Sequence, residues 1–326
     1  MLIALLQLGV GLVILSAGGH YLVRGATSIA LLARISVTVV ALTVVAMGTS
    51  LPELAVSFTA AARGSTDIAY SNIIGSSIFN IGAILGVAAL IAAIPVQRQT
   101  IRVEYPIMLV ASIVVLLLAR DARVDRLEGV FLIVGLGLFV SYTVYLARGG
   151  VPTSTEEMSL AREVKRAAHL KQGARRAWGI NIGLVLLGFV ALGAGAYLAV
   201  AGAVAGAEII GVEERIIGLT VIAMGTSLPE LATCVAAVRQ NEPDVALGNV
   251  IGSNIFNLLA ILGITAIAFP VPVHARSLAL DNWVLLAFTI ALLPMMWLGR
   301  KRISRFDGVL LLTAFVAYMS YVVITR

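Results

Sequence analysis

Two glutamates stand inside apolar segments of the sequence, and their surroundings are nearly identical. Glu53 lies in TVVAMGTSLPELA at residues 43–55, and Glu230 lies in TVIAMGTSLPELA at residues 220–232. The other fifteen of the 17 acidic residues fall in loops or near the ends of apolar segments. A carboxylate at the centre of a bilayer costs at least ~2.5–3.5 kcal/mol, and neither segment offers a Lys or Arg nearby to offset it. A bound cation or a proton remains as the means of neutralising each carboxylate.

Each glutamate directly follows a proline that should break its helix. Pro52 and Pro229 lack an N–H group, and each ring clashes with the carbonyl four residues earlier, which belongs to a glycine in both copies. The sequence therefore predicts breaks near residues 47–49 and 224–226. Carbonyls freed at such a break are tolerated at membrane depth only where they line a cavity. Those of Ala46 and Ala223 are candidate cation ligands.

Hydroxyl and amide side chains recur around both breaks. Thr49 and Glu53 are four residues apart, so in a continuous helix their oxygens share one face. The next apolar segment carries a polar stripe at four-residue intervals, for which the other interpretation is hydrogen bonding between helices. The polar residues are Thr49, Ser50, Asn72, Ser76 and Asn80 in the first copy, and Thr226, Ser227, Asn249, Ser253 and Asn257 in the second. Asn72 and Asn249 are expected to pack or to support the ligands.

These side chains form a set of ligands suited to a hard cation. Carboxylate, hydroxyl, amide and carbonyl oxygens, without thiolates or imidazoles, favour Ca²⁺ and Na⁺. The two glutamates supply a charge of about −2, which one Ca²⁺ balances, and several Na⁺ could share the same oxygens in its place. Mutually exclusive occupancy is the physical basis of exchange. Protonation of the glutamates could replace Na⁺, so exchange of Ca²⁺ for protons stays an alternative.

The composition requires a membrane protein. Of the 326 residues, 60% are hydrophobic and 12% are charged, whereas soluble chains have about 45–50% apolar and about 25% charged residues. The single cysteine and three scattered histidines exclude a disulfide framework and a cysteine- or histidine-based metal site. The net charge of +6 comes without a basic patch interleaved with aromatics, so no nucleic-acid partner is expected. We expect no cofactor and no enzymatic activity.

Ten apolar segments of roughly 20 residues predict an all-α protein with ten transmembrane helices. Their approximate limits are residues 2–23, 36–62, 68–95, 104–119, 128–147, 179–205, 215–238, 244–270, 280–298 and 307–324. Long Leu-, Ala- and Gly-rich runs do not alternate with period two, as barrel strands would. Glu128 and Asp307 stand at equivalent span starts and are expected to cap or anchor them.

The chain is an internal duplication. Residues 43–86 and 220–263 are identical at 26 of 44 positions, with a constant offset of 177. Residues 1–147 form the first five-helix repeat, 148–178 a basic linker, and 179–326 the second repeat. Five spans separate each motif from its copy, so the two repeats should be inverted, as in secondary transporters that bind substrate near the membrane midplane where repeats meet.

The distribution of Lys and Arg predicts the orientation. With the N-terminus outside, sixteen of the 23 basic residues, including those of the central linker, face the cytoplasm, and seven lie outside. We therefore expect an integral cell-membrane protein of the inner or plasma membrane, with both termini outside and the linker cytoplasmic.

The paired GTSLPE and GSxIFN motifs resemble the two α-repeats of the sodium/calcium exchanger family, within the cation/calcium antiporter superfamily, and the similarity spans the chain. This resemblance implies an antiporter that exchanges Na⁺ for Ca²⁺ by alternating access, with the first and sixth helices as the moving pair. It implies calcium ligands at Thr49, Glu53, Thr226 and Glu230. Sodium ligands would be both glutamates, Ser50, Ser76, Ser227, Ser253 and the carbonyls of Ala46 and Ala223. Asn80 and Asn257 match the remaining site positions.

Three other functions are alternatives to exchange of Na⁺ for Ca²⁺. Potassium-dependent or proton-coupled exchange would use the same site. A cation channel usually has oligomeric symmetry around a continuous pore, whereas this chain carries its symmetry internally. A membrane scaffold would not explain the duplicated glutamates. We expect a monomer to suffice, with Ca²⁺, Na⁺ and the lipid bilayer as partners.

Overall fold

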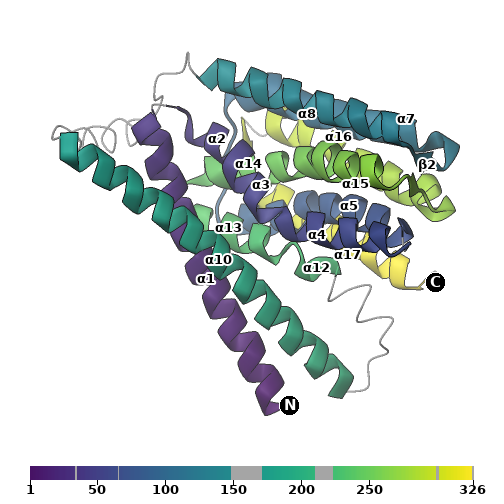
Figure 1. Ribbon diagram of the computed structural model, residues 1–326, viewed down its shortest axis with the longest axis horizontal. Coiled ribbons are helices and arrows are strands. Elements are labelled where there is room, and N and C mark those ends of the chain that lie inside the picture. The colour runs from purple at the N-terminus through teal and green to yellow at the C-terminus, as the bar shows by residue number, and fades with distance from the viewer. Residues whose placement is uncertain (34, 65, 148–170, 210–222, 299–300, 325–326) are drawn as a thin grey trace. The chain divides into compact units, whose positions relative to one another are not determined.

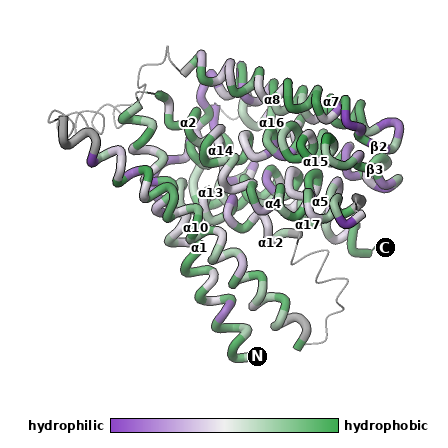
Figure 2. Tube along the Cα trace, in the orientation of Figure 1, coloured by the Kyte–Doolittle hydropathy of each residue, from purple (hydrophilic) through white to green (hydrophobic). Residues whose placement is uncertain are grey.

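The structure, a computed structural model, describes all residues except 34, 65, 148–170, 210–222, 299–300 and 325–326. The described part is helical nearly throughout, as the composition predicts (Figure 1). Hydrophobic residues cover most of the helices, and hydrophilic residues gather around the β2–β3 connections (Figure 2). The linker at 148–178 falls mostly outside the described residues.

Eight helical stretches of the described part are long and apolar enough to cross a membrane. They are Leu2–Ala33, Ile68–Ile91, Thr100–Asp121, Arg126–Leu146, Arg176–Gly206, Pro243–Ala268, Ser277–Trp297 and Arg305–Ile324. Val37–Thr49 and Leu51–Ala62 meet at a bend of 43° and make a ninth if they count as one crossing. The expected span at 215–238 includes residues outside the described part, so the count of ten stays a prediction. The protein is a multi-span membrane protein.

The chain folds into two compact units, and each unit draws on both sequence repeats. Unit 1 comprises Met1–Thr49 and Val140–Asn249, and unit 2 comprises Ser50–Phe139 and Val250–Arg326. The elements of unit 1 are α1 (Leu2–Ala33), α2 (Val37–Val40), the π-helical turn η1 (Ala41–Val45), α3 (Ala46–Thr49), the end of α8 (Arg126–Ala147), α10 (Lys171–Ile209), α12 (Ala223–Gly225), α13 (Leu228–Arg239) and most of α14 (Pro243–Ile255).

Within unit 1, α1 and α10 lie side by side and approach so closely that glycine is required at their contact (Figure 1). A Cβ atom at Gly18 would lie 2.9 Å from the backbone nitrogen of Leu192, and one at Gly195 would lie 2.7 Å from that of Leu15. Contacting residue numbers fall on α10 as they rise on α1, so the helices are antiparallel. The close-contact glycines are Gly11, Gly18 and Gly25 on α1, and Gly188, Gly195 and Gly202 on α10.

Unit 2 contains most of α8, the end of α14 and shorter helices joined by two-residue strands. Its elements in the first repeat are α4 (Leu51–Ala62), α5 (Thr66–Phe79), the π-helix η2 (Asn80–Leu85), α6 (Gly86–Ile91), β1 (Ile94–Pro95), the π-helix η3 (Thr100–Glu104), α7 (Tyr105–Leu118), the 3₁₀ turn η4 (Ala119–Asp121) and β2 (Arg123–Val124). Those of the second repeat are the π-helix η6 (Phe256–Ile261), α15 (Leu262–Ala268), β3 (Val271–Pro272), the π-helix η7 (Ser277–Asp281), α16 (Asn282–Leu298), β4 (Arg302–Ile303) and α17 (Arg305–Ile324).

The strands of unit 2 pair reciprocally between the repeats. β1 pairs antiparallel with β4 through Ile94 and Ile303, and β2 pairs antiparallel with β3 through Val124 and Val271. Ile94 and Val271 occupy equivalent repeat positions, as do Val124 and Ile303. Because the equivalent residues exchange places between the two pairs, a local two-fold axis relates the pair β1–β4 to the pair β2–β3. The duplication in the sequence is therefore also a duplication in the fold of unit 2.

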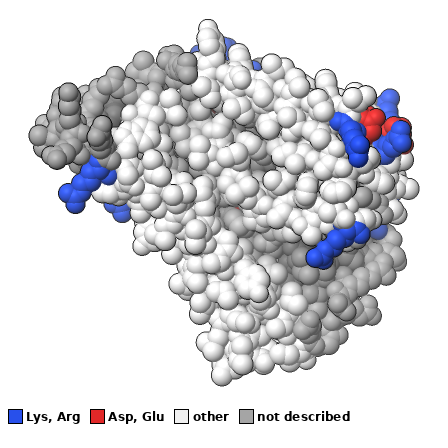
Figure 3. Space-filling view, in the orientation of Figure 1, with Lys and Arg blue, Asp and Glu red and all other residues white. Residues whose placement is uncertain are grey.

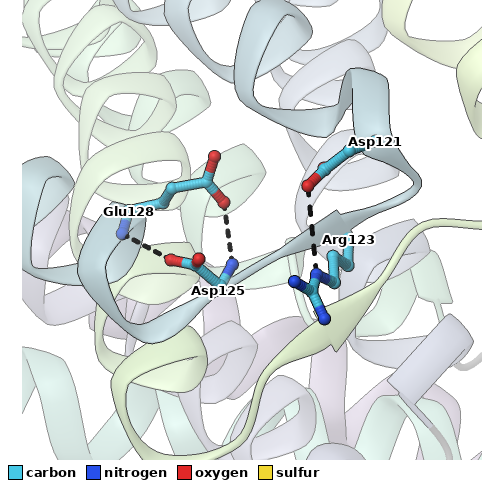
Figure 4. A network of polar contacts seen from close by, with 4 residues as sticks. All are labelled: Asp121, Arg123, Asp125 and Glu128. Atoms are coloured by element: carbon cyan, nitrogen blue, oxygen red, sulfur yellow. Dashed lines mark hydrogen bonds and ion pairs between the residues drawn. The ribbon is translucent and has the colours of Figure 1, made fainter.

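Equivalent acids cap the starts of α8 and α17. Glu128 accepts a hydrogen bond from the backbone N–H of Asp125 at 2.8 Å, and Asp125 accepts one from the N–H of Glu128 at 2.9 Å (Figure 4). Asp307 accepts from the N–H of Ser304 at 2.8 Å. Both are capping boxes, which satisfy two of the N–H groups left open at a helix start. The predicted capping role of Glu128 and Asp307 is confirmed.

Charged side chains gather in a few places on the face shown in Figure 3, and the other described residues visible on that face are uncharged. An ion pair joins Arg123 and Asp121 at 3.9 Å, with both side chains more than 60% exposed (Figure 4). A surface without charges is what the hydrocarbon core of a bilayer requires.

Candidate functional site

The chain breaks before each intramembrane glutamate. α3 ends at Thr49 and α4 begins at Leu51, and the intervening Ser50 adopts φ −84° and ψ 5°. In the second repeat α12 ends at Gly225 and α13 begins at Leu228, with Ser227 at φ −90° and ψ 8°. These angles belong to the sparsely populated bridge region, where many active-site residues are found. The predicted breaks are confirmed, the first of them one residue later than expected.

Close packing requires a glycine beside both breaks, independently of the prolines. A Cβ atom at Gly48 would lie 2.1 Å from the ring of Phe189, and one at Gly225 would lie 2.3 Å from a methyl group of Val200. Both partners belong to α10, and all four residues lie in unit 1. The chain at each break is therefore packed directly against a long helix of the same unit.

Thr49 and Glu53 do not share a helix face. The expectation assumed a continuous helix, but Thr49 is the last residue of α3 and Glu53 lies in the first turn of α4, beyond the bend of 43°. Thr226 likewise precedes α13, whereas Glu230 lies in the first turn of α13. Each glutamate is instead positioned at a helix N-terminus, where the helix dipole favours a negative charge.

Unit 1 holds one buried group of candidate residues. Ser227, just before α13, and Glu230, in its first turn, are buried, with 0% and 1% of their surface exposed. α13 packs against α3. Thr49, at the end of α3, donates a hydrogen bond to the amide oxygen of Asn249 at 3.3 Å and also contacts the carbonyl of Ala46 at 3.3 Å. Thr226 is partly exposed. Hydroxyl, amide and carboxylate side chains of both repeats thus lie within one unit.

Unit 2 holds a second buried group, on elements that pack together. Glu53 on α4, Ser76 on α5 and Asn257 on η6 are all 4% exposed or less, and α4, α5 and η6 contact one another. The remaining buried members are Ser50, Asn80 and Ser253. These six residues of unit 2 therefore lie inside the protein and not on its surface.

Of the candidate hydroxyl and amide residues in unit 2, four have polar side-chain atoms without a hydrogen-bond partner among the described residues. They are the hydroxyls of Ser76 and Ser253, the amide oxygen of Asn80 and both amide atoms of Asn257. A buried polar group without a partner costs about 1–3 kcal/mol, and native proteins usually satisfy such groups. The concentration of unsatisfied oxygens in one unit beside a buried carboxylate is the arrangement expected of a site that receives a cation.

The two asparagines of this group lie on π-helical turns. η2 begins at Asn80 and η6 contains Asn257. A π-helical turn inserts an extra residue into the helical ladder, and such turns are frequent at functional sites. The sequence does not predict these turns, because the apolar periodicity of the segments does not reveal a switch from i, i+4 to i, i+5 hydrogen bonding. The one hint of an irregularity in the sequence is that an Asn recurs at the equivalent positions 80 and 257 in otherwise apolar segments.

Asn72 and Asn249 join helices. The amide nitrogen of Asn72 donates to Ser57 at 2.9 Å, and that of Asn249 donates to the sulfur of Cys234 at 3.5 Å. Asn249 also accepts the hydroxyl of Thr49, so it contacts a candidate ligand directly. These contacts match the packing and supporting roles expected of the two asparagines.

The chemistry of both groups is that of a hard cation. Among the described residues, no three His, Cys, Asp or Glu side chains cluster as a metal site. Each glutamate is instead accompanied by neutral hydroxyl and amide oxygens, which are ligands that Ca²⁺ and Na⁺ accept. The carbonyl of Ala46 and the main chain of Ala223, at the start of α12, lie on the helices that precede the two breaks.

Comparison with known proteins identifies relatives over nearly the whole chain. The family described as "Sodium/calcium exchanger protein" matches residues 3–146 and 180–324. The putative antiporter CaxA of Alkalimonas amylolytica is 40% identical over 320 residues, covering 98% of both chains. The sodium/calcium exchanger MaX1 of Methanosarcina acetivorans is 32% identical over 337 residues, covering 95% of both chains.

Solved structures agree with the sequence matches. A structure of the sodium-calcium exchanger NCX_Mj, soaked with 2.5 mM Na⁺ and 0.1 mM Ca²⁺, is 27% identical and covers 97% of both chains with a TM-score of 0.82. Another, soaked with 10 mM Na⁺ and 10 mM Sr²⁺, covers 98% of both chains with a TM-score of 0.83. On the family match across both repeats and these full-length relatives, the chain belongs to the sodium/calcium exchanger family.

Proposed function

We propose that this protein is a secondary-active antiporter that exchanges Na⁺ for Ca²⁺ across the membrane by alternating access. The observation that carries the proposal is the group of buried, unsatisfied oxygens in unit 2, contributed by Ser76, Asn80, Ser253 and Asn257. The elements of Ser76 and Asn257 pack against α4, the helix of Glu53. Hard cations would satisfy these oxygens, and the protein would recover the free energy lost by burying them.

The buried serines favour Na⁺ as the counter-ion. Neutral hydroxyls offer ligands to a small monovalent cation without adding charge, whereas protonation of a glutamate would need no such shell. The names of two relatives, a sodium/calcium exchanger and an antiporter, support the same pair of ions and the same mode of transport. We further propose ten transmembrane helices in two inverted repeats, which the antiparallel packing of the equivalent helices α1 and α10 supports.

Exchange by alternating access requires that the protein bind either Ca²⁺ or Na⁺, but not both at once. Ca²⁺ and Na⁺ would compete for the same carboxylates, so release of one ion accompanies binding of the other. The two breaks, at Ser50 and Ser227, stand immediately before the glutamates and mark the points at which main-chain direction changes. Discontinuous helices of this kind form the binding sites of many secondary transporters.

Purified protein in liposomes tests the proposal. An outward Na⁺ gradient should drive uptake of calcium-45, with no uptake when K⁺ replaces Na⁺ on both sides. Uptake driven only by a pH gradient would overturn the assignment of Na⁺ as the counter-ion. Uptake that requires both Na⁺ and K⁺ would identify potassium-dependent exchange. Calcium flux without any counter-ion would identify a channel. Alternating access predicts that Na⁺ efflux stops when external Ca²⁺ and Na⁺ are both absent.

Two substitutions test the site within the same assay. Glu53→Gln and Glu230→Gln should each abolish exchange, because each removes a buried negative charge that a cation needs. Glu128→Gln is the matched control, since Glu128 caps α8 outside both groups and Gln also serves in a capping box. Near-normal exchange in either of the first two variants would refute the site assignment.

A further inference from the structure

A groove between α1 and α13 has a long apolar part and a cationic end, and this is the chemistry of a phospholipid. Two adjoining cavities, of about 240 and 610 Å³, share Ser16, Ala236 and Arg239 as lining residues and so form one continuous groove. All of its lining residues belong to unit 1. The larger cavity lies within the roughly 300–1,000 Å³ that bound small molecules occupy.

The apolar part of the groove is a surface suited to an acyl chain. Its walls are Leu12 and Leu15 of α1 and Leu228, Leu231 and Val235 of α13. Leu12 is 51% exposed on a helix whose outer face is apolar, as expected of a helix that meets lipid. The floor is formed where the helices touch, since a Cβ atom at Gly19 would lie 2.7 Å from the carbonyl oxygen of Ala232.

The length of the groove matches one leaflet. From Leu228 to Arg239, α13 advances eleven residues, which at about 1.5 Å per residue is roughly 16 Å. The hydrocarbon core of a bilayer is about 30 Å thick, so this distance is close to half of it. One acyl chain could therefore follow α13 from the end of the helix to the depth of the break at Ser227.

The other end of the groove is polar and positively charged. Arg239, the last residue of α13, is exposed and lines both cavities. Gln240 joins the two helices there by donating to the carbonyl of His20 at 3.4 Å. Arg24 is also exposed and lies one helical turn beyond His20 on α1. A phosphate at this end would meet cations and hydrogen-bond donors.

We propose that this groove binds an anionic phospholipid, with an acyl chain along Leu12, Leu231 and Val235 and the phosphate at Arg239. The charge complementarity of the polar end argues for an anionic headgroup over a zwitterionic one. Anionic lipids are enriched in the cytoplasmic leaflet, and each basic residue at the surface strengthens their binding about fivefold. The Lys and Arg distribution assigns this end of α13 to that leaflet.

Native mass spectrometry of the full-length protein in detergent tests the proposal. The protein is titrated with phosphatidylglycerol or with phosphatidylcholine of the same acyl chains, and lipid-bound species are compared. The wild type should retain phosphatidylglycerol about fivefold more than phosphatidylcholine. Arg239→Gln should reduce retention to the phosphatidylcholine level, and Arg239→Lys should preserve it. Equal retention of the two lipids by the wild type would overturn the headgroup assignment.

Variants of the walls separate the groove from surface charge. Val235→Trp should fill the groove and reduce retention of both lipids. If Val235→Trp does not fold, Leu12→Trp, at a more exposed position on α1, should have the same effect. Arg126→Gln is the matched control, because Arg126 is exposed at a span start and lines no part of the groove. A loss of lipid in Arg126→Gln equal to that in Arg239→Gln, or unchanged retention in the folded Trp variants, would overturn the proposal. Neither outcome depends on transport, so a failure here leaves the proposed exchange untouched.

Discussion

The side-chain amide of Asn72 donates a hydrogen bond to the hydroxyl of Ser57 at 2.9 Å, and this contact joins α5 to α4, the helix of Glu53. Asn249 makes the equivalent contact with the sulfur of Cys234, which joins α14 to α13, the helix of Glu230. Each glutamate helix is therefore tied to the following helix by an asparagine one turn before a buried serine of the polar stripe. The donor is retained in both repeats, while the acceptor changes from oxygen to sulfur.

Asn72→Ala should destabilise the protein in the absence of any transported ion. The substitution removes the donor and leaves the buried hydroxyl of Ser57 to find another partner, at a cost of about 1–3 kcal/mol. Thermal unfolding of the detergent-purified protein in a chelator measures the effect as a lower Tm. Ser71→Ala, an exposed neighbour on α5, should leave Tm unchanged. A Tm of Asn72→Ala equal to that of Ser71→Ala would contradict the supporting role.

Ser76→Ala and Ser253→Ala should behave in the opposite way. Because their hydroxyls have no partner among the described residues, replacing them should leave the ion-free Tm unchanged or raise it. Added Ca²⁺ or Na⁺ stabilises whichever state binds it, so the increase in Tm on adding ions should shrink in these variants. Unfolding curves with and without each ion give both quantities. An ion-free Tm that falls as far as that of Asn72→Ala would show that these serines serve only in packing.

The break before Glu53 requires a residue without a side chain. Gly48→Ala should destabilise the protein by about 1–3 kcal/mol, because its Cβ would meet the ring of Phe189. Phe189→Ala in the same chain should recover part of the loss, and the coupling in a double-mutant cycle measures the contact. Gly193→Ala on α10, where a Cβ would meet no atom within 4 Å, is the control. Additive effects of the two substitutions would argue against this contact.

The two acids near the start of α8 should differ in their importance. Glu128→Ala removes half of a capping box and should cost about 0.5–2 kcal/mol. Asp121→Ala removes an exposed ion pair with a separation of 3.9 Å, and such pairs contribute about 0–1 kcal/mol. Chemical unfolding of both variants under one set of conditions compares them. A larger effect of Asp121→Ala would reverse this ranking.

The sequence predicted what depends on local chemistry. The breaks before Glu53 and Glu230 were predictable, because proline excludes a regular helix at a defined distance. The burial of the two glutamates was also predictable, since each stands in a long apolar run. The caps at Glu128 and Asp307 follow from the spacing of an acid three residues after the residue that precedes the helix.

Other features depend on contacts that a linear pattern does not encode. The prediction that Thr49 and Glu53 share one helix face was wrong, because the break falls between the two residues. The pairing of Ile94 with Ile303 joins segments more than 200 positions apart, and two-residue strands leave no periodicity to read. The π-helical turns at Asn80 and Asn257 arise from how the backbone accommodates packing, since the apolar composition is the same in an α-helix.

The glycine contact between α1 and α10 has a mechanical consequence. Gly11 and Gly18 are seven residues apart, as are Gly188 and Gly195, so the gaps in each helix recur about every 10.5 Å along its axis. Sliding one helix along the other by less than this distance would press side chains against backbone atoms, and closely packed interiors resist such compression. For displacements smaller than this distance the pair should therefore behave as a single stiff rod, and a force applied to α1 would be transmitted to α10 without loss of register.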